Sequence, residues 1–157
     1  MPMDARATDL PRFEPRNPDY ERLIRDSFYK QGLMRTLGAE IADIVPGAVD
    51  LRLPASDGVT QQHGYIHAGA TTALADTAAG CAALTLFPAG TGVLTSEFKV
   101  NLLNPAVGDV VVAEGRVIKS GRRLTICKAD VYGERNNASV HILTGLFTMV
   151  CVENLEG

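Results

Sequence analysis

Residues 67–87 restrict the possible folds of this chain more than any other stretch. They are rich in alanine, the residue with the highest helix propensity, and they contain no lysine, arginine or glutamate. A helix without a charged face is buried on all sides, and its small side chains allow other backbone elements to approach closely. We therefore predict one long central helix enclosed by the rest of the chain, with Asp76 as its only carboxylate.

The residues on both sides of this helix have the pattern of β-strands. Four segments rich in Val, Ile, Leu and Thr follow it, at residues 93–103, 109–119, 123–132 and 139–152, with turn residues between them. Two strands at residues 39–45 and 48–53 precede it, joined by the turn Pro46-Gly47. The sequence therefore predicts an α+β fold with an antiparallel sheet of about six strands packed on one helix.

The N-terminal region differs in character from the rest. Residues 1–19 are polar and contain four prolines, which predicts a flexible arm. A short helix is expected over residues 20–31, with Gly32 as its C-terminal cap. Its buried stripe is predicted to consist of Leu23, Ile24, Ser27 and Phe28. The length of 157 residues fits a single domain over residues 1–157 with this helical extension.

Composition excludes several classes of protein. The net charge of −3 argues against a nucleic-acid partner, and no apolar run is long enough to span a membrane. Cys81, Cys127 and Cys151 all lie in apolar segments, so we interpret them as buried thiols of a reducing compartment. No signal peptide is visible, and a cytoplasmic location is expected.

The last strand indicates an oligomer. By strict alternation, Ile142 and Leu146 fall on one face, whereas His141 and Phe147 fall on the other. Both faces are mostly apolar, so both are expected to be covered. One helix covers one face only, so the other face requires a partner subunit or the N-terminal arm.

Candidate catalytic residues gather where the central helix begins. The unpaired N–H groups of Ala68 and Gly69 and the positive helix end can stabilise an oxyanion on a carbonyl substrate. Gln61, or alternatively Gln62, can add a side-chain N–H, and Asp76 can act as nucleophile or general base. Asp76 lies ~12 Å along the helix from Ala68. If both serve one site, Asp76 must come from a second subunit.

These residues resemble a motif of the PaaI-like hotdog thioesterases. Gln61 corresponds to the amide residue of that family, His67-Ala68-Gly69 to its His-Gly-Gly-like turn, and Asp76 to its carboxylate. The resemblance extends over residues 33–153 and includes Asn104-Pro105-Ala106. One departure is Ala68, which stands where the family usually has a glycine; it keeps the backbone N–H but adds a methyl group.

The resemblance implies a hotdog fold, in which the sheet wraps around the helix and two subunits share one continuous sheet. It implies a homodimer or homotetramer that hydrolyses an aryl- or medium-chain acyl-CoA, with coenzyme A as part of the substrate and no other cofactor. Thr95 falls where the family often has a hydroxyl near the acid, and His67 is expected mainly to brace the turn. Arg122 and Arg123 in the turn Ser120-Gly121-Arg122-Arg123 are candidates to bind the coenzyme A phosphates.

Two other functions fit the same fold. A hotdog hydratase would use a catalytic histidine, whereas the single acid with an upstream glutamine favours hydrolysis. A non-catalytic acyl-CoA-binding protein is the second alternative. His63 and His67 have a spacing seen in metal sites, but no third ligand is near them, so no metal is expected. Candidates for the acyl pocket are Leu33, Met34 and Phe98.

Overall fold

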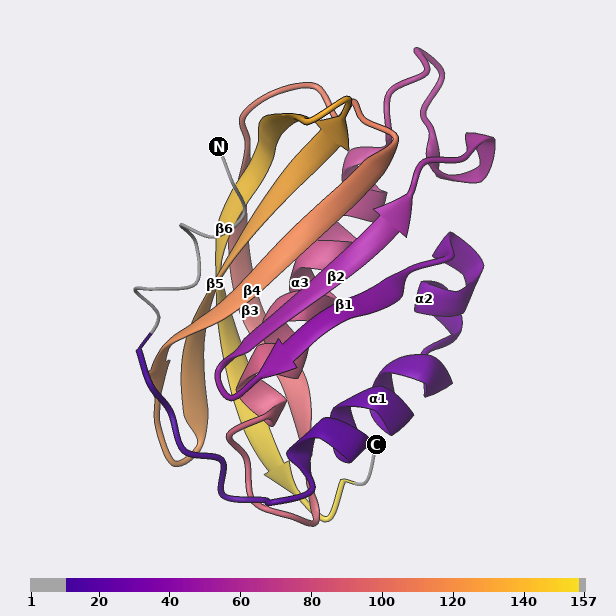
Figure 1. The fold of residues 1–157 in the computed structure, drawn as a ribbon. Coiled ribbons are helices and arrows are strands. Elements are labelled where there is room, and N and C mark those ends of the chain that lie inside the picture. Colours follow the sequence, from indigo (N-terminus) through magenta and orange to yellow (C-terminus); the bar gives the residue numbers. More distant parts are fainter. Residues whose placement is uncertain (1–10, 156–157) are drawn as a thin grey trace.

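The computed structural model describes residues 11–155, and its main feature is one antiparallel sheet of six strands (Figure 1). The strand order across the sheet is β1-β2-β4-β5-β6-β3, so β1 and β3 are the two edges. This is the predicted α+β hotdog architecture. The strands are β1 Glu40–Val45, β2 Ala48–Pro54, β3 Thr91–Leu102, β4 Val110–Ser120, β5 Leu124–Arg135 and β6 Ala138–Glu153.

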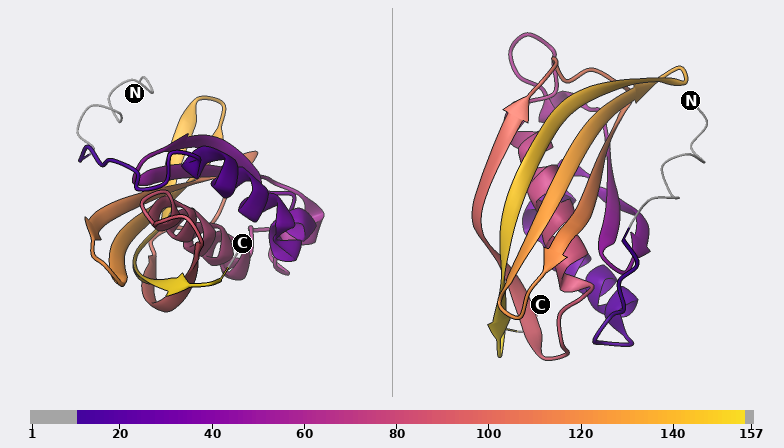
Figure 2. Two further views of the ribbon diagram at one scale, coloured as in Figure 1. Left: turned by 90° about the horizontal axis from the view of Figure 1, so that it is seen from below. Right: turned by 90° about the vertical axis from the view of Figure 1, so that its left-hand side faces the viewer.

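The central helix α3, Ala68–Leu84, lies inside the curve of the sheet (Figure 2). Eleven of its residues are buried, among them Leu74, Ala75 and Ala78. The approach to β4 is very close, because a Cβ atom at Gly115 would lie 2.3 Å from the carbonyl oxygen of Ala78. The alanine-rich sequence is therefore required by packing, since larger side chains would separate the helix from the sheet.

The N-terminal region forms two helices where one was predicted. Helix α1, Tyr20–Lys30, buries Ile24 and Phe28 as expected. The prediction that Gly32 caps this helix is wrong: the chain bends at Gln31, and Gly32 begins a second helix, α2, Gly32–Leu37. The bend allows α2 to place Met34 in the core, and Gly38, with φ 76°, ends it in the left-handed conformation.

The predicted N-terminal arm lies only partly within the described residues. Residues 1–10 are outside them. Residues 11–19 have no strand or long helix, but Phe13 packs against the core beside Gly47 in the turn between β1 and β2. None of the described helices is long and apolar enough to cross a membrane.

Strand β6 departs from strict alternation. The pairing of β5 with β6 shifts between Val131 and Tyr132, so β6 contains one extra residue at this point. As a result Ile142 is buried, whereas His141 lies on the outer face and contacts Asp130. The predicted faces of these two β6 residues are therefore wrong, because a bulge exchanges the faces of a strand.

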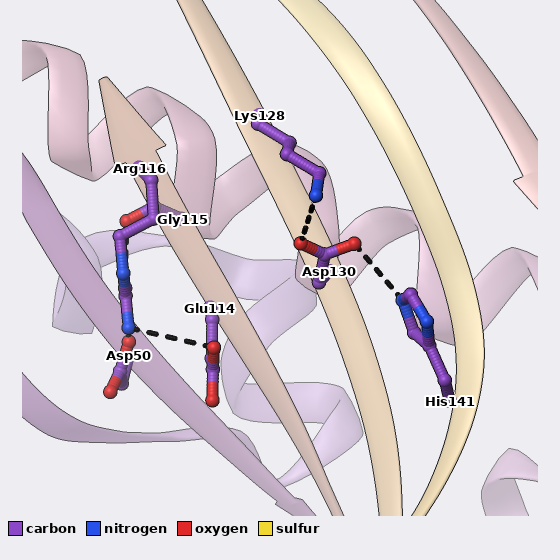
Figure 3. A network of polar contacts seen from close by, with 7 residues as sticks. All are labelled: Asp50, Glu114, Gly115, Arg116, Lys128, Asp130 and His141. Atoms are coloured by element: carbon purple, nitrogen blue, oxygen red, sulfur yellow. Dashed lines mark hydrogen bonds and ion pairs between the residues drawn. The ribbon is translucent and has the colours of Figure 1, made fainter. Parts of the chain in front are cut away.

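The outer face of the sheet carries two groups of polar contacts (Figure 3). Asp130 accepts hydrogen bonds from Lys128 at 2.8 Å and lies 3.0 Å from Nε2 of His141. Burial raises the pKa of Asp130, but its hydrogen bonds outweigh that effect and hold the pKa below its usual value. A second group on this face joins Arg116 to Asp50 and Glu114. Around them, three large apolar side chains are about half exposed: Ile118, Leu124 and Leu146.

Candidate active site

The N-terminal end of α3 opens into a cleft of about 580 Å³. Its walls come from the loop before the helix, the first turn of the helix, and the segment that follows β3. Apolar walls with a few polar groups are typical of a ligand-binding cleft. The lining residues are Gln61, Gln62, Tyr65, Ile66, His67, Ala68, Thr71, Leu102, Leu103, Asn104, Pro105, Ala106 and Ile142.

Backbone hydrogen bonds hold the loop before the helix in a compact shape. Gln61 N–H donates to the carbonyl of Tyr65 at 2.8 Å, and Ile66 N–H donates to the carbonyl of Ala106 at 3.0 Å. On the other wall, the side chain of Asn104 donates to the carbonyl of His141 at 2.9 Å. The resemblance motif Asn104-Pro105-Ala106 thus lines the same cleft as Gln61.

The side chain of Gln61 is oriented by the same loop. Its Oε1 accepts the backbone N–H of His63. Gln61 lines the cleft, and within the described residues no hydrogen bond engages its NH₂ group, which is a donor. Gln62, the alternative amide, also lines the cleft, but it makes no side-chain hydrogen bond within the described residues.

The first turn of α3 has one donor without a partner. His67 is the N-cap: its Nδ1 accepts the N–H of Gly69 at 2.7 Å, and its carbonyl accepts the N–H groups of Ala70 and Thr71. Within the described chain no hydrogen bond engages the N–H of Ala68, which lines the cleft. Of the two predicted oxyanion donors, Ala68 therefore has a free N–H in this structure and Gly69 does not.

Asp76 lies in the middle of α3, facing β3. The hydroxyl of Thr95 donates to Oδ1 of Asp76 at 2.7 Å and lies 3.4 Å from Sδ of Met149. Burial raises the pKa of Asp76, and the hydrogen bond from Thr95 lowers it by a smaller amount. A carboxylate with a raised pKa is a better base near neutral pH than an ordinary aspartate.

Within one chain, the predicted arginines lie away from the cleft and at the other end of the helix from its N-terminus. Arg122 and Arg123 are exposed in the turn between β4 and β5, where Gly121 N–H donates to the carbonyl of Leu124 at 2.9 Å (Figure 1). This turn is at the far end of α3, because β4 begins beside the cleft and runs toward the helix C-terminus. Ser120, the last residue of β4, lies at the same end.

One chain therefore does not bring the predicted site residues together. The cleft contains Gln61, His67 and Ala68, whereas Asp76 is not among its lining residues. Asp76 and Thr95 form a second group about two turns further along the helix. Ala68 and Asp76 belong to one continuous helix, so the separation of ~12 Å expected from the helical rise applies to them in the folded chain.

Other expected residues have different surroundings. Met34 is fully buried in the core and cannot line an open acyl pocket, whereas Leu33 is exposed on α2. Phe98 on β3 is half exposed, with its ring centroid 5.5 Å from that of Phe147. Sequence reasoning missed Tyr65 and Leu102 as cleft residues, because nothing in their spacing indicates that the two segments meet.

The cysteines are free thiols. Cys81 and Cys127 are buried, and Cys151 is only half-buried. Burial, together with the negative charge of Asp76, raises the pKa of Cys81 to about 12, so this thiol is not a nucleophile. No group of three His, Cys, Asp or Glu side chains within residues 11–155 has the geometry of a metal site.

An antiparallel sheet wrapped around a buried helix defines the hotdog fold. The cleft at the helix N-terminus and the carboxylate on the same helix suit a thioesterase. The chain belongs to the thioesterase superfamily, whose family model matches residues 63–139. A thioesterase family protein from Silicibacter pomeroyi is 42% identical, with a TM-score of 0.84 over 85% of this chain and 98% of that protein. This protein is accordingly a thioester hydrolase.

One curated relative is also a thioester hydrolase, and a further solved structure shares the fold. A 1,4-dihydroxy-2-naphthoyl-CoA hydrolase from Listeria monocytogenes is 27% identical over 103 residues, which cover 66% of this chain and 84% of the hydrolase. The PaaI protein of the phenylacetic acid degradation operon of E. coli has a TM-score of 0.75 at 16% identity, over 85% of this chain and 94% of PaaI. At that identity the likeness concerns the fold alone.

Proposed function

We propose that this protein hydrolyses an aryl- or medium-chain acyl-CoA to the free acid and coenzyme A. The observation that carries the proposal is the hydrogen-bonded pair of Asp76 and Thr95 on the helix whose N-terminus opens into the cleft. The pair offers a carboxylate of raised pKa, and the helix offers a donor for a developing negative charge.

In the proposed reaction, the thioester carbonyl oxygen lies against the N–H of Ala68. The positive end of the helix dipole and the NH₂ group of Gln61 stabilise the charge that develops there. Asp76 either removes a proton from an attacking water or attacks the carbonyl carbon itself. If Asp76 acts as a base, the water oxygen bonds to the carbonyl carbon, the C–S bond breaks, and coenzyme A leaves as a thiol with the proton that Asp76 took from the water. If Asp76 attacks, a mixed anhydride forms and coenzyme A leaves as a thiolate that solvent protonates; a water molecule then hydrolyses the anhydride to the free acid and restores the carboxylate.

We propose that each site is shared between two subunits, with Asp76 and Thr95 from one chain facing the cleft of its partner. The cleft and Asp76 are too far apart in one chain to contact one carbonyl group. A pair of chains related by a two-fold axis at β3 would place their central helices side by side in opposite directions. The Arg122 and Arg123 turn of one chain would then lie at the same end as the cleft of the other, where the phosphates of coenzyme A can be bound.

The acyl group is proposed to be aromatic or of medium chain length. The cleft has apolar walls from Tyr65, Leu102 and Ile142, and its volume suits an acyl group of this size rather than an acetyl group. The relative from Listeria acts on an aromatic acyl-CoA. Free thiols and a coenzyme A substrate also fit a cytoplasmic location.

A panel of acyl-CoA esters tests the proposal. Release of the free thiol should be fastest with aryl or medium-chain esters and much slower with acetyl-CoA, and Asp76→Asn should abolish it. Hydration of an enoyl-CoA in place of hydrolysis would identify the protein as a hydratase. Binding of acyl-CoA without turnover of any ester in the panel would identify a non-catalytic binding protein.

A further inference from the structure

Strand β3 is a long edge of the sheet, and its outer side pairs with no strand within residues 11–155. It has twelve residues, and Leu94, Phe98 and Leu102 on it are 55%, 45% and 57% exposed. Long edges with exposed apolar side chains pair with other chains unless they are blocked. Both edges carry a bulge, after Ile41 in β1 and at Ser96 in β3, but β1 is only six residues long, so β3 offers the longer edge for pairing.

For two chains joined antiparallel through β3, as the proposed shared site requires, we propose one register. Phe98 lies on the two-fold axis, and Glu97 of each chain lies opposite Lys99 of the partner. The inference rests on the shared site of the proposed function and adds the register in which the two chains join. That register decides which residues of one chain meet the cleft of the other.

The direction of the side chains limits the possible registers. Phe98 pairs with buried Phe147, so it faces inward, whereas Lys99 pairs with exposed Leu146 and faces outward. Side chains directly opposite each other in a sheet lie on the same face. An axis between two neighbouring residues would set Phe98 opposite Lys99 of the partner, on opposite faces. The axis must therefore pass through a single residue.

The charges that would lie opposite each other favour one position of the axis. An axis at Glu97 would place two glutamates opposite each other, and an axis at Lys99 would place two lysines together, which is unfavourable. An axis at Val100 would set Lys99 opposite Asn101. With Phe98 on the axis, Glu97 and Lys99 form two ion pairs, one on each side. Within residues 11–155 neither side chain is engaged in an ion pair, and Lys99 contacts only the side-chain oxygen of Asn101.

The backbone N–H and C=O groups of β3 point in the directions that this register requires. Leu103 N–H donates to the carbonyl of Ile142 on β6 at 2.8 Å. Because bonded residues alternate along an antiparallel pair, Lys99 directs its N–H and C=O toward β6, and Phe98 directs them toward the open edge. The two Phe98 residues at the axis can thus form two backbone N–H···O hydrogen bonds with each other. On either side, Glu97 and Lys99 of the partner form a non-hydrogen-bonded pair, in which the side chains lie closer together.

The same register joins the two halves of the proposed site. The bulge of β3 makes Ser96 an extra residue, so Thr95 lies opposite Val100 of the partner. Val100 is two residues from Leu102, which lines the cleft together with Ala68. Thr95 holds Asp76 by its hydrogen bond. Asp76 of one chain is therefore brought beside the cleft of the partner.

Cysteine cross-linking measures the register directly. In the proposed register, position 97 lies about 4.5 Å in Cα distance from position 99 of the partner, which suits a disulfide. Two copies of position 97 are ~8 Å apart, too far for a disulfide, and the same holds for position 99. Glu97→Cys and Lys99→Cys proteins are refolded separately and as an equal mixture, oxidised with copper phenanthroline, and run on a non-reducing gel. The wild-type protein controls for the three native cysteines.

The mixture should cross-link until about half of the dimers are covalent, since half of them are mixed when chains pair at random. Each variant alone should stay at the wild-type level. Cross-linking of Glu97→Cys alone, of Lys99→Cys alone, or of Lys99→Cys with Asn101→Cys would place the axis elsewhere and overturn the register. Absence of cross-linking in every sample would also overturn the register, because it would show that positions 97 and 99 of the two chains do not meet.

Charge reversal provides a second measurement. Glu97→Lys and Lys99→Glu should each weaken dimerisation roughly tenfold, because each turns two attractions into two repulsions. The double variant Glu97→Lys with Lys99→Glu should restore the wild-type dissociation constant in sedimentation experiments, and a double variant as weak as the singles would contradict the pairing. Neither measurement requires a substrate, so the register and the proposed reaction can fail independently.

Discussion

The hydroxyl of Thr95 on the edge strand β3 donates a 2.7 Å hydrogen bond to Asp76 on the buried helix α3. Thr95 thereby fixes one oxygen of the carboxylate and stabilises its charged form against the effect of burial. The contact also ties the candidate catalytic acid to the strand through which we expect a second subunit to join. Several consequences of this arrangement can be measured.

Replacement of Asp76 by asparagine should remove hydrolysis while leaving the fold intact. The amide has the same size but cannot act as base or nucleophile, so turnover should fall at least ~100-fold. Far-ultraviolet circular dichroism would verify the fold. Asp26→Asn, which changes an exposed acid on α1, should keep full activity and serves as the control. A folded Asp76→Asn protein with near-normal turnover would remove Asp76 from the reaction.

The acidic side of the pH profile should depend on Thr95. Asp76 must be ionised to act, so kcat/KM should decrease as the pH falls through its raised pKa. Thr95→Val removes a hydrogen bond to the charged form, which raises this pKa further and moves the acidic limb to higher pH. Thr95→Ser retains the hydroxyl and should leave the limb in place. A limb that stays in place or moves to lower pH in Thr95→Val would be inconsistent with this role.

Changing both Arg122 and Arg123 to alanine should raise KM for an acyl-CoA roughly threefold to tenfold. The expected reason is the loss of ion pairs with the nucleotide phosphates, which would also make the effect smaller at high salt. The same acyl group on pantetheine, which lacks the nucleotide, should show little change. Arg22→Ala with Arg25→Ala on α1 controls for the net charge. Equal losses with both substrates would place these arginines away from the phosphates.

Subunit mixing should show that each site draws on two chains. Gln61→Ala and Asp76→Ala proteins, each strongly impaired, are refolded together and the mixed dimer is isolated with two tags. One of its sites carries both defects, whereas the other combines an intact Gln61 with an intact Asp76, so activity should return to about half of the wild-type value. A mixed dimer no faster than the mean of its parents would indicate sites built within single chains.

Gly115→Ala should destabilise the fold strongly. A Cβ atom there would lie 2.3 Å from the carbonyl oxygen of Ala78, which belongs to a helix backbone and cannot move alone. We expect a loss of about 2–3 kcal/mol in the free energy of unfolding, measured by urea denaturation. Gly32→Ala, at an open position in α2, should be neutral or stabilising. A Gly115→Ala protein as stable as the wild type would mean that helix and sheet separate more easily than their packing indicates.

Much of this fold can be read from local sequence. The alanine-rich segment without charged side chains predicted α3, because only complete burial suits such a helix. Turn residues located the hairpins, and Asn136 and Asn137 do adopt positive φ values. The family resemblance pointed to Asp76 and Thr95, which the structure joins by a hydrogen bond. These features depend on residues near one another in the chain or on a motif with regular spacing.

Tertiary structure decided the rest. Ile142 is buried because a bulge shifts β6, and Gly32 begins a helix because Met34 reaches the core; neither depends on local propensity. The cap by His67 leaves Ala68 with the free N–H, and the cleft walls come from segments far apart in sequence. The sequence by itself determined the central helix, the six strands and the chemical groups that they carry. Only the packing of those elements decided which groups meet, because contacts between distant segments follow from shape and burial over the whole domain.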